Sequence, residues 1–169
     1  ERARWAMRGF LCGEDWADSL KAIEACDEWE RSRLAEWVCS SESLVGYTAT
    51  SLLVARTAMW HPDETMIEAA LKRLWKIGQK RADAMVSILA VAHERGLLEI
   101  AIEAAEALVD IDGYDAHADL LANHCQQLLA SVGRPEDVLT LLSGGLPSAL
   151  PKQLMGVYAD ALRATERQL

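Results

Sequence analysis

The sequence predicts an all-α protein of antiparallel helix pairs, and three observations support this. Ala, Leu and Glu, which favour helices, dominate the 169 residues, while residues typical of strands are sparse. Apolar residues recur at helical spacing along almost the whole chain. Ten Gly and four Pro leave connections so short that neighbouring helices must run antiparallel. Helix pairs joined in this way form either a right-handed α-solenoid or a compact multi-helix bundle.

Ten helices are expected, most of them from an apolar stripe and the others from the breakers around them. From the N-terminus they cover residues 2–12, 14–27, 30–40, 42–58, 62–77, 80–95, 97–110, 115–132, 135–143 and 150–166. The stripes are Trp16, Leu20 and Ile23; Val45, Thr48, Leu52 and Ala55; Ile67, Ala70, Leu71 and Leu74; Met85, Ile88, Leu89 and Ala92; Leu97, Ala101, Ala104 and Leu108; Leu121, Cys125, Leu128 and Val132; Leu154, Val157 and Ala161.

Prolines and glycines mark the expected helix boundaries. Pro62, Pro135 and Pro151 stand where a first helical turn should begin, since the missing N–H has no partner to lose there. Acidic residues follow Pro62 and Pro135 directly, and these favour the positive end of the helix dipole. Glycines stand where four helices should end, as C-terminal caps: Gly78, Gly96, Gly113 and Gly144.

Two segments repeat one pattern. A helix ends at Gly96 and again at Gly133, and a small or apolar residue returns five positions later, at Ala101 and Val138. The pattern resembles the turn and second helix of tetratricopeptide repeats, mainly over residues 80–166. The two copies lie 37 residues apart, against about 34 in that family. The resemblance implies a solenoid whose concave surface holds a peptide or a helix of a partner.

Composition limits the classes of function. The net charge of -9 argues against general binding of nucleic acid and against a polybasic membrane contact. The longest uncharged apolar stretch, 84–92, is too short to span a bilayer. We therefore expect a soluble, cytoplasmic protein whose residues 1–169 form a single helical-repeat domain, which can be a piece of a longer chain. The cysteines are interpreted as small core residues in a reducing compartment: Cys12, Cys26, Cys39 and Cys125.

An acidic stripe is the clearest surface feature. Glu99, Glu103, Glu106 and Asp110 fall on the helix face opposite the apolar stripe that begins at Leu97. Three further acidic residues extend it: Asp112, Asp115 and Asp119. The stripe is interpreted either as a docking surface for a basic segment of a partner or as an ordinary solvated face.

A basic counterpart lies in the preceding helices. It consists of Lys72, Arg73, Lys76, Lys80 and Arg81. These residues can hold a phosphate or an acidic partner, or they can complement the C-terminal end of a helix. Because no aromatic residues are interleaved on that face and the chain is acidic, nucleic-acid binding is not expected.

All six tryptophans lie in the first 75 residues. Trp29 and Trp37 flank charged residues, which suggests partial exposure, and exposed Trp is enriched at binding hot spots. The alternative is that the tryptophans fill space between helix pairs. The set is Trp5, Trp16, Trp29, Trp37, Trp60 and Trp75.

No catalytic, metal or cofactor motif is present in the sequence. The acidic loop at 110–115 lacks the spacing of a calcium-binding EF-hand. His117 and His124 are seven residues apart, about 10 Å along a helix, which is too far for them to share one zinc ion with Cys125. We therefore expect no enzyme, no metal and no cofactor.

The expected function is that of a protein–protein interaction module or scaffold that binds a peptide or helix. The candidate partner-binding residues are Glu99, Glu103, Glu106, Asp110, Trp29 and Trp37. The alternative is a sensory or regulatory helical-repeat domain of a larger bacterial regulator, binding a small ligand or another domain.

Overall fold

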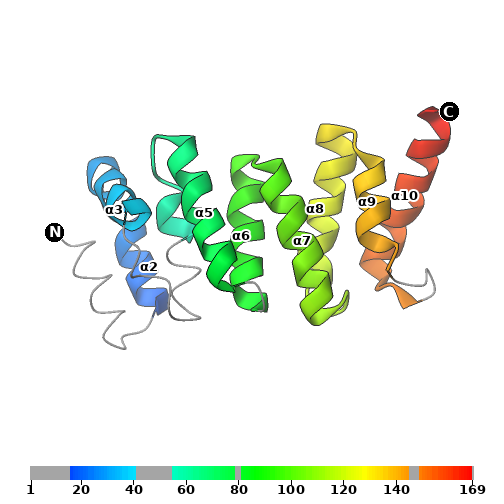
Figure 1. The fold of residues 1–169 in the computed structure, drawn as a ribbon, viewed down its shortest axis with the longest axis horizontal. Coiled ribbons are helices and arrows are strands. Elements are labelled where there is room, and N and C mark those ends of the chain that lie inside the picture. The colour runs from blue at the N-terminus through cyan, green and yellow to red at the C-terminus, as the bar shows by residue number, and fades with distance from the viewer. Residues whose placement is uncertain (1–15, 41–54, 79–80, 145–148, 169) are drawn as a thin grey trace.

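The computed structural model describes residues 16–40, 55–78, 81–144 and 149–168, and every regular element in these residues is helical (Figure 1). The all-α prediction is therefore confirmed for the described part of the chain. The elements are α2 (Trp16–Glu24), α3 (Glu28–Ser40), α5 (Glu64–Gly78), α6 (Ala82–Arg95), α7 (Leu98–Asp112), α8 (Ala118–Gln127), η2 (Leu128–Val132), α9 (Pro135–Leu142) and α10 (Lys152–Gln168).

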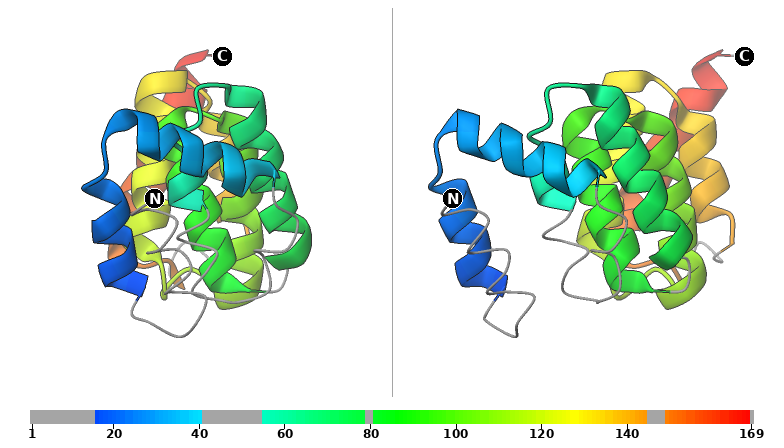
Figure 2. Two further views of the ribbon diagram at one scale, coloured as in Figure 1. Left: turned by 90° about the vertical axis from the view of Figure 1, so that its left-hand side faces the viewer. Right: turned by 60° about the vertical axis from the view of Figure 1, so that its left-hand side comes forward.

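The helices follow one another in chain order along the longest axis, with α2 and α3 at one end and α10 at the other (Figure 1). Figure 2 shows α3 lying crosswise to α2 and α5. The helix expected at 2–12 and most of the one expected at 42–58 lie outside the described residues, while residues 55–58 are helical as predicted.

Asp27 determines where α3 begins. Its carboxylate accepts a hydrogen bond from the Glu30 backbone N–H at 2.8 Å, which satisfies one donor of the first turn. As a result, α3 starts at Glu28, two residues before the expected position. The Arg31 guanidinium donates to the Glu24 carbonyl at the end of α2 at 3.2 Å, so α3 also satisfies an acceptor of the helix before it.

The placement of Pro62 in a first helical turn was wrong. Asp63 is the capping residue, because its carboxylate accepts hydrogen bonds from the Thr65 backbone N–H at 2.9 Å and from the Thr65 hydroxyl at 2.7 Å. These bonds lower the pKa of Asp63. Pro151 likewise precedes its helix, and its carbonyl accepts from later backbone N–H groups of α10. Pro135 alone occupies the first position of a helix, α9, as expected.

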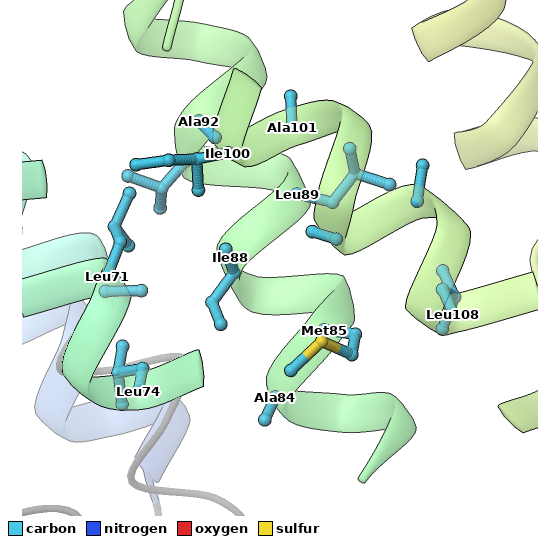
Figure 3. Close-up of a cluster of buried hydrophobic side chains, with 14 of the residues drawn as sticks. Leu71, Leu74, Ala84, Met85, Ile88, Leu89, Ala92, Ile100, Ala101 and Leu108 are labelled. Carbon is cyan, nitrogen blue, oxygen red and sulfur yellow. The ribbon is translucent and has the colours of Figure 1, made fainter. Parts of the chain in front are cut away.

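Helix α6 is buried along most of its length because α5 and α7 both pack against it. Figure 3 shows Leu71 and Leu74 of α5 on one side of α6 and Leu108 of α7 on the other. Ala92 and Ala101 stand at the α6–α7 contact, where small side chains allow two helix backbones to approach closely. The contact between α6 and α7 is the most extensive among the described helices.

The two glycine turns of the repeat pattern have the same left-handed conformation. Gly96 ends α6 at φ +70° and Gly133 ends η2 at φ +69°. Ala101 and Val138, five residues later, are both fully buried. The single helix expected at 115–132 was wrong at both ends, because α8 begins only at Ala118 and the last five residues form the π-helical turn η2.

Gly144 does not act as the predicted left-handed cap. The residue that ends α9 is Ser143, in a right-handed conformation. A Cβ atom at Gly144 would instead lie 3.1 Å from the Tyr114 hydroxyl oxygen. That hydroxyl donates to the Leu141 carbonyl at 2.9 Å, so the glycine leaves room for a side chain that satisfies the end of α9. Gly113 does end α7, at φ +71°, as predicted.

Contacts between helices are local in the chain. Besides successive helices, the helices separated by one other pack together: α5 with α7, α7 with α9, and α8 with α10. One continuous cluster of buried apolar residues extends from Ile23 of α2 to Ala161 of α10. Within the described residues, no helix has the length and apolar character needed to span a bilayer.

Candidate functional site

The four predicted carboxylates of α7 lie on its exposed face. Glu99, Glu103, Glu106 and Asp110 are all exposed, at the helical spacing that the sequence indicates. The opposite face is buried against α6 through apolar residues: Ile100, Ala101, Ala104, Ala105 and Leu108. The amphipathic packing of α7 therefore determines where its carboxylates point.

The acidic region continues beyond α7. Asp112, Asp115 and Asp119 are also exposed, in the connection to α8 and in its first turn. From residue 96 to residue 133 the sequence has seven carboxylates and no Lys or Arg, whereas the rest of the chain has 19 carboxylates against 17 basic residues. Most of the net charge is therefore concentrated here. We call the seven carboxylates the acidic surface: Glu99, Glu103, Glu106, Asp110, Asp112, Asp115 and Asp119.

Other side chains contact part of this surface. The Arg134 guanidinium lies 2.7 Å from Glu99, and His117 lies 2.9 Å from Asp112. The pKa of Lys72 on α5 is raised, first by its hydrogen bond and charge contact with Glu68 and then by the charge of Glu103. The remaining members have no hydrogen bond or ion pair with another described residue: Glu106, Asp110, Asp115 and Asp119.

Two carboxylates of the acidic surface lie where the helix dipole disfavours them. The last turn of α7 contains Asp110 and Asp112 and no basic residue. The C-terminal end of a helix carries partial negative charge, so these residues repel both one another and the helix end. A cation brought to this end of α7 would relieve the repulsion.

The predicted basic counterpart does not form one surface. Lys72 is bound to Glu68 on its own helix at 2.6 Å, and Arg81 pairs with Asp83 at 3.1 Å. The guanidinium of Arg73 is half-buried and donates to the carbonyl of Cys39. Lys80 lies outside the described residues. The structure thus assigns these residues mainly to contacts within the fold.

The two candidate tryptophans differ in their surroundings. Trp29 has 66% of its surface exposed, and the Arg33 guanidinium lies 5.1 Å from its ring centroid. Trp37, on the same helix, is half-buried against the core, as are Trp60 and Trp75. Filling space therefore accounts for these three residues, while Trp29 remains available for contact. The side chains of Trp5 and Trp16 lie outside the described residues.

Comparisons of the chain with protein-family models, with characterised proteins and with solved structures give no match.

The burial of a histidine, His124, is the feature that sequence reasoning missed. His124 on α8 is only 1% exposed, and both of its ring nitrogens lack a hydrogen-bond partner among the described residues. Its ring faces that of His93, with the ring centroids 6.4 Å apart. The pKa of His124 is lowered to about 4, mainly by burial and also by the charge of His93, while the charge of Asp137 opposes the shift. Its place on the buried stripe of α8 was the available signal.

The other two residues considered as zinc ligands have different surroundings. His117 pairs with Asp112 at the surface, whereas Cys125 is buried. Burial raises the pKa of Cys125 to about 12, so this thiol stays protonated at neutral pH and is a poor nucleophile or ligand. Cys26 and Cys39 are also buried and unpaired, as predicted for core residues, and Cys12 lies outside the described residues.

Proposed function

We propose that the chain is a protein-interaction module in which the helix pairs form a right-handed, tetratricopeptide-like α-solenoid. Three observations support this arrangement. The main contacts among the described helices join helices close in the chain, the two left-handed glycine turns at Gly96 and Gly133 are alike, and each is followed five residues later by a buried small or apolar residue. A stack of this kind offers an extended surface for a partner, which suits binding rather than catalysis.

The partner that fits is a basic peptide or a basic helix, bound along the acidic surface. The observation that carries this proposal is the concentration of charge: seven exposed carboxylates in residues 96–133, without one Lys or Arg. Four of them have no partner among the described residues, and two stand at the disfavoured end of α7. A Lys- or Arg-rich segment would supply the missing cations, and attraction between opposite charges would accelerate and orient its docking.

The test uses a fluorescein-labelled helical peptide rich in Lys and Ala, with a Glu-for-Lys peptide of the same length as its counterpart. Fluorescence anisotropy should show binding of the basic peptide alone, weakening as salt rises because exposed charges are screened. The variant Glu103→Gln/Glu106→Gln/Asp110→Asn should bind at least about tenfold more weakly, a loss of about 1.4 kcal/mol.

A matched control separates this surface from net charge. The variant Glu24→Gln/Glu36→Gln/Glu64→Gln removes the same charge from exposed positions elsewhere and should bind the peptide like the unmodified chain. Equal weakening by both variants would show that the peptide senses only total charge, and the proposal would fail. Cross-linking in the native cells should then capture a partner with the control variant that is lost with the α7 variant.

A further inference from the structure

Helix α10 carries an uncovered apolar face at one end of the row of helices (Figure 1). Met155 is 48% exposed and Leu162 is 42% exposed. They lie seven residues apart, two turns along the same side of the helix, with half-buried Ala159 between them. In the described part of the chain, α10 is the only helix that exposes two large apolar side chains.

Charged residues of opposite sign flank this stripe. Lys152 lies in the first turn of α10 and Glu166 in the last, both exposed and each seven residues from Ala159. Neither has a hydrogen bond or ion pair with another described residue. Both positions also oppose the helix dipole, which favours anions at the N-terminal end and cations at the C-terminal end. The first turn of α10 thus lacks an acidic residue, and in the last turn Glu166 stands beside only one basic residue, Arg167.

We propose that a second copy of this chain covers the face, with the two α10 helices packed antiparallel about a twofold axis near Ala159. In this register Lys152 of each copy lies beside Glu166 of the other, because both are about 10 Å from the axis by helical rise. Met155 and Leu162, four residues before and three after Ala159, meet across the axis. The small side chain at the crossing point allows the helices to approach closely.

The charge distribution of the chain favours α10 as the place where two copies meet. The chain as a whole is acidic, but α10 has three basic residues, Lys152, Arg163 and Arg167, against two acidic ones, Asp160 and Glu166. Two copies can therefore approach through α10 without bringing their acidic surfaces together. A single pair of helices is at the low end of stable interface sizes, so we expect a dimer that dissociates in the micromolar range, roughly 10 to 100 µM.

Reciprocal charge reversal tests this register. Lys152→Glu places two carboxylates opposite each other in the homodimer, and Glu166→Lys places two ammonium groups there, so each variant should sediment as a monomer at concentrations where the unmodified chain dimerises. An equimolar mixture of the two variants should dimerise again, because every pair in the mixed dimer joins a Glu to a Lys. The double variant Lys152→Glu/Glu166→Lys should dimerise on its own.

The apolar contribution has its own control. Leu162→Gln should abolish dimerisation, whereas Val132→Gln removes a similarly exposed apolar residue from η2 and should leave it unchanged. The proposal is overturned if the unmodified chain is monomeric at all these concentrations, or if the mixture of charge variants stays monomeric although each variant has unchanged circular dichroism. Peptide binding to the acidic surface is measured separately, so either proposal can fail without the other.

Discussion

Helices α5 and α7 have the same length, 15 residues, and both pack on α6. The charges on their exposed faces are nevertheless distributed differently. On α5, Glu64 stands in the first turn, Lys76 stands in the last, and Glu68 pairs with Lys72 at 2.6 Å. On α7, every charged residue is acidic, including both in the last turn.

The difference indicates which of the two charged surfaces cannot be explained by helix stability alone. The charges of α5 complement its dipole and one another, so helix stability accounts for them. On α7, by contrast, Asp110 and Asp112 stand at the end where anions are least favoured. A surface that stabilises the helix poorly by itself is the better candidate for binding a cation-bearing partner.

The largest expected effect is the loss of stability when a leucine on the buried side of α5 or α7 is shortened. This loss should be similar for the two helices. Leu71 on α5 and Leu108 on α7 are both fully buried against α6. Leu71→Ala and Leu108→Ala should each lower the free energy of unfolding by about 2 to 5 kcal/mol, through lost burial and the cavity left behind. Urea denaturation followed by circular dichroism measures this. A loss below about 1 kcal/mol for one of them would mean that its helix is not packed as described.

A second test asks whether His124 in the interior, rather than the acidic surface of α7, determines how the stability of the fold changes as pH falls. The pKa of His124 is about 4 in the folded chain, below its ordinary value of 6.5, so the unfolded chain binds the proton first as pH falls. Stability should therefore be complete above about pH 6.5 and decline toward pH 4, by on the order of 2 kcal/mol between pH 7 and pH 4.5.

The variant His124→Leu isolates this contribution. Leu cannot gain a proton, so the difference between the unmodified chain and the variant should grow as pH falls from 7 to 4.5, in urea denaturation at each pH. His61→Gln, which changes a histidine near the surface, should leave the profile unchanged. Parallel profiles for the unmodified chain and the His124 variant would contradict the assignment.

The smallest expected effects test the contrast between the exposed faces directly. Lys72→Gln breaks the pair with Glu68 and should lower the melting temperature, whereas Glu106→Gln/Asp110→Asn relieves repulsion at the end of α7 and should raise it. Each shift should be roughly 1 to 2 °C in low salt and shrink in high salt. Differential scanning fluorimetry resolves such shifts. If the melting temperatures of the α5 and α7 variants shifted in the same direction, the contrast between the two exposed faces would be contradicted. An α7 variant that is more stable but no longer binds the peptide would support it.

Much of this arrangement was predictable from local patterns. The exposure of Glu99, Glu103, Glu106 and Asp110 follows from the spacing of the apolar residues between them, because a helix buries one side. The helix ends at Gly96 and Gly113, both with positive φ, were predictable from glycine at the end of a stripe. The start of α5 was predicted two residues too early. The hydrogen bonds between Asp63 and Thr65 cap the helix there, and they override the preference of Pro62 for a first turn.

Other features depend on residues far apart in the chain and could not be read from spacing. The pairing of Glu99 with Arg134 joins positions 35 residues apart, and the approach of His93 to His124 needs α6 and α8 to lie side by side. The π turn at 128–132 and the use of Ser143 in place of Gly144 as a cap likewise depend on what packs around them.

By itself the sequence determined the helical class, the inner and outer sides of each helix and the acidic character of residues 96–133, because these depend on the order of residues over one or two turns. Only the tertiary structure decided which carboxylates keep a cation nearby, that Trp37 is half-buried while Trp29 is exposed, and that Met155 and Leu162 are left uncovered. Those properties depend on which distant helix approaches each side chain, and local periodicity carries no information about that approach.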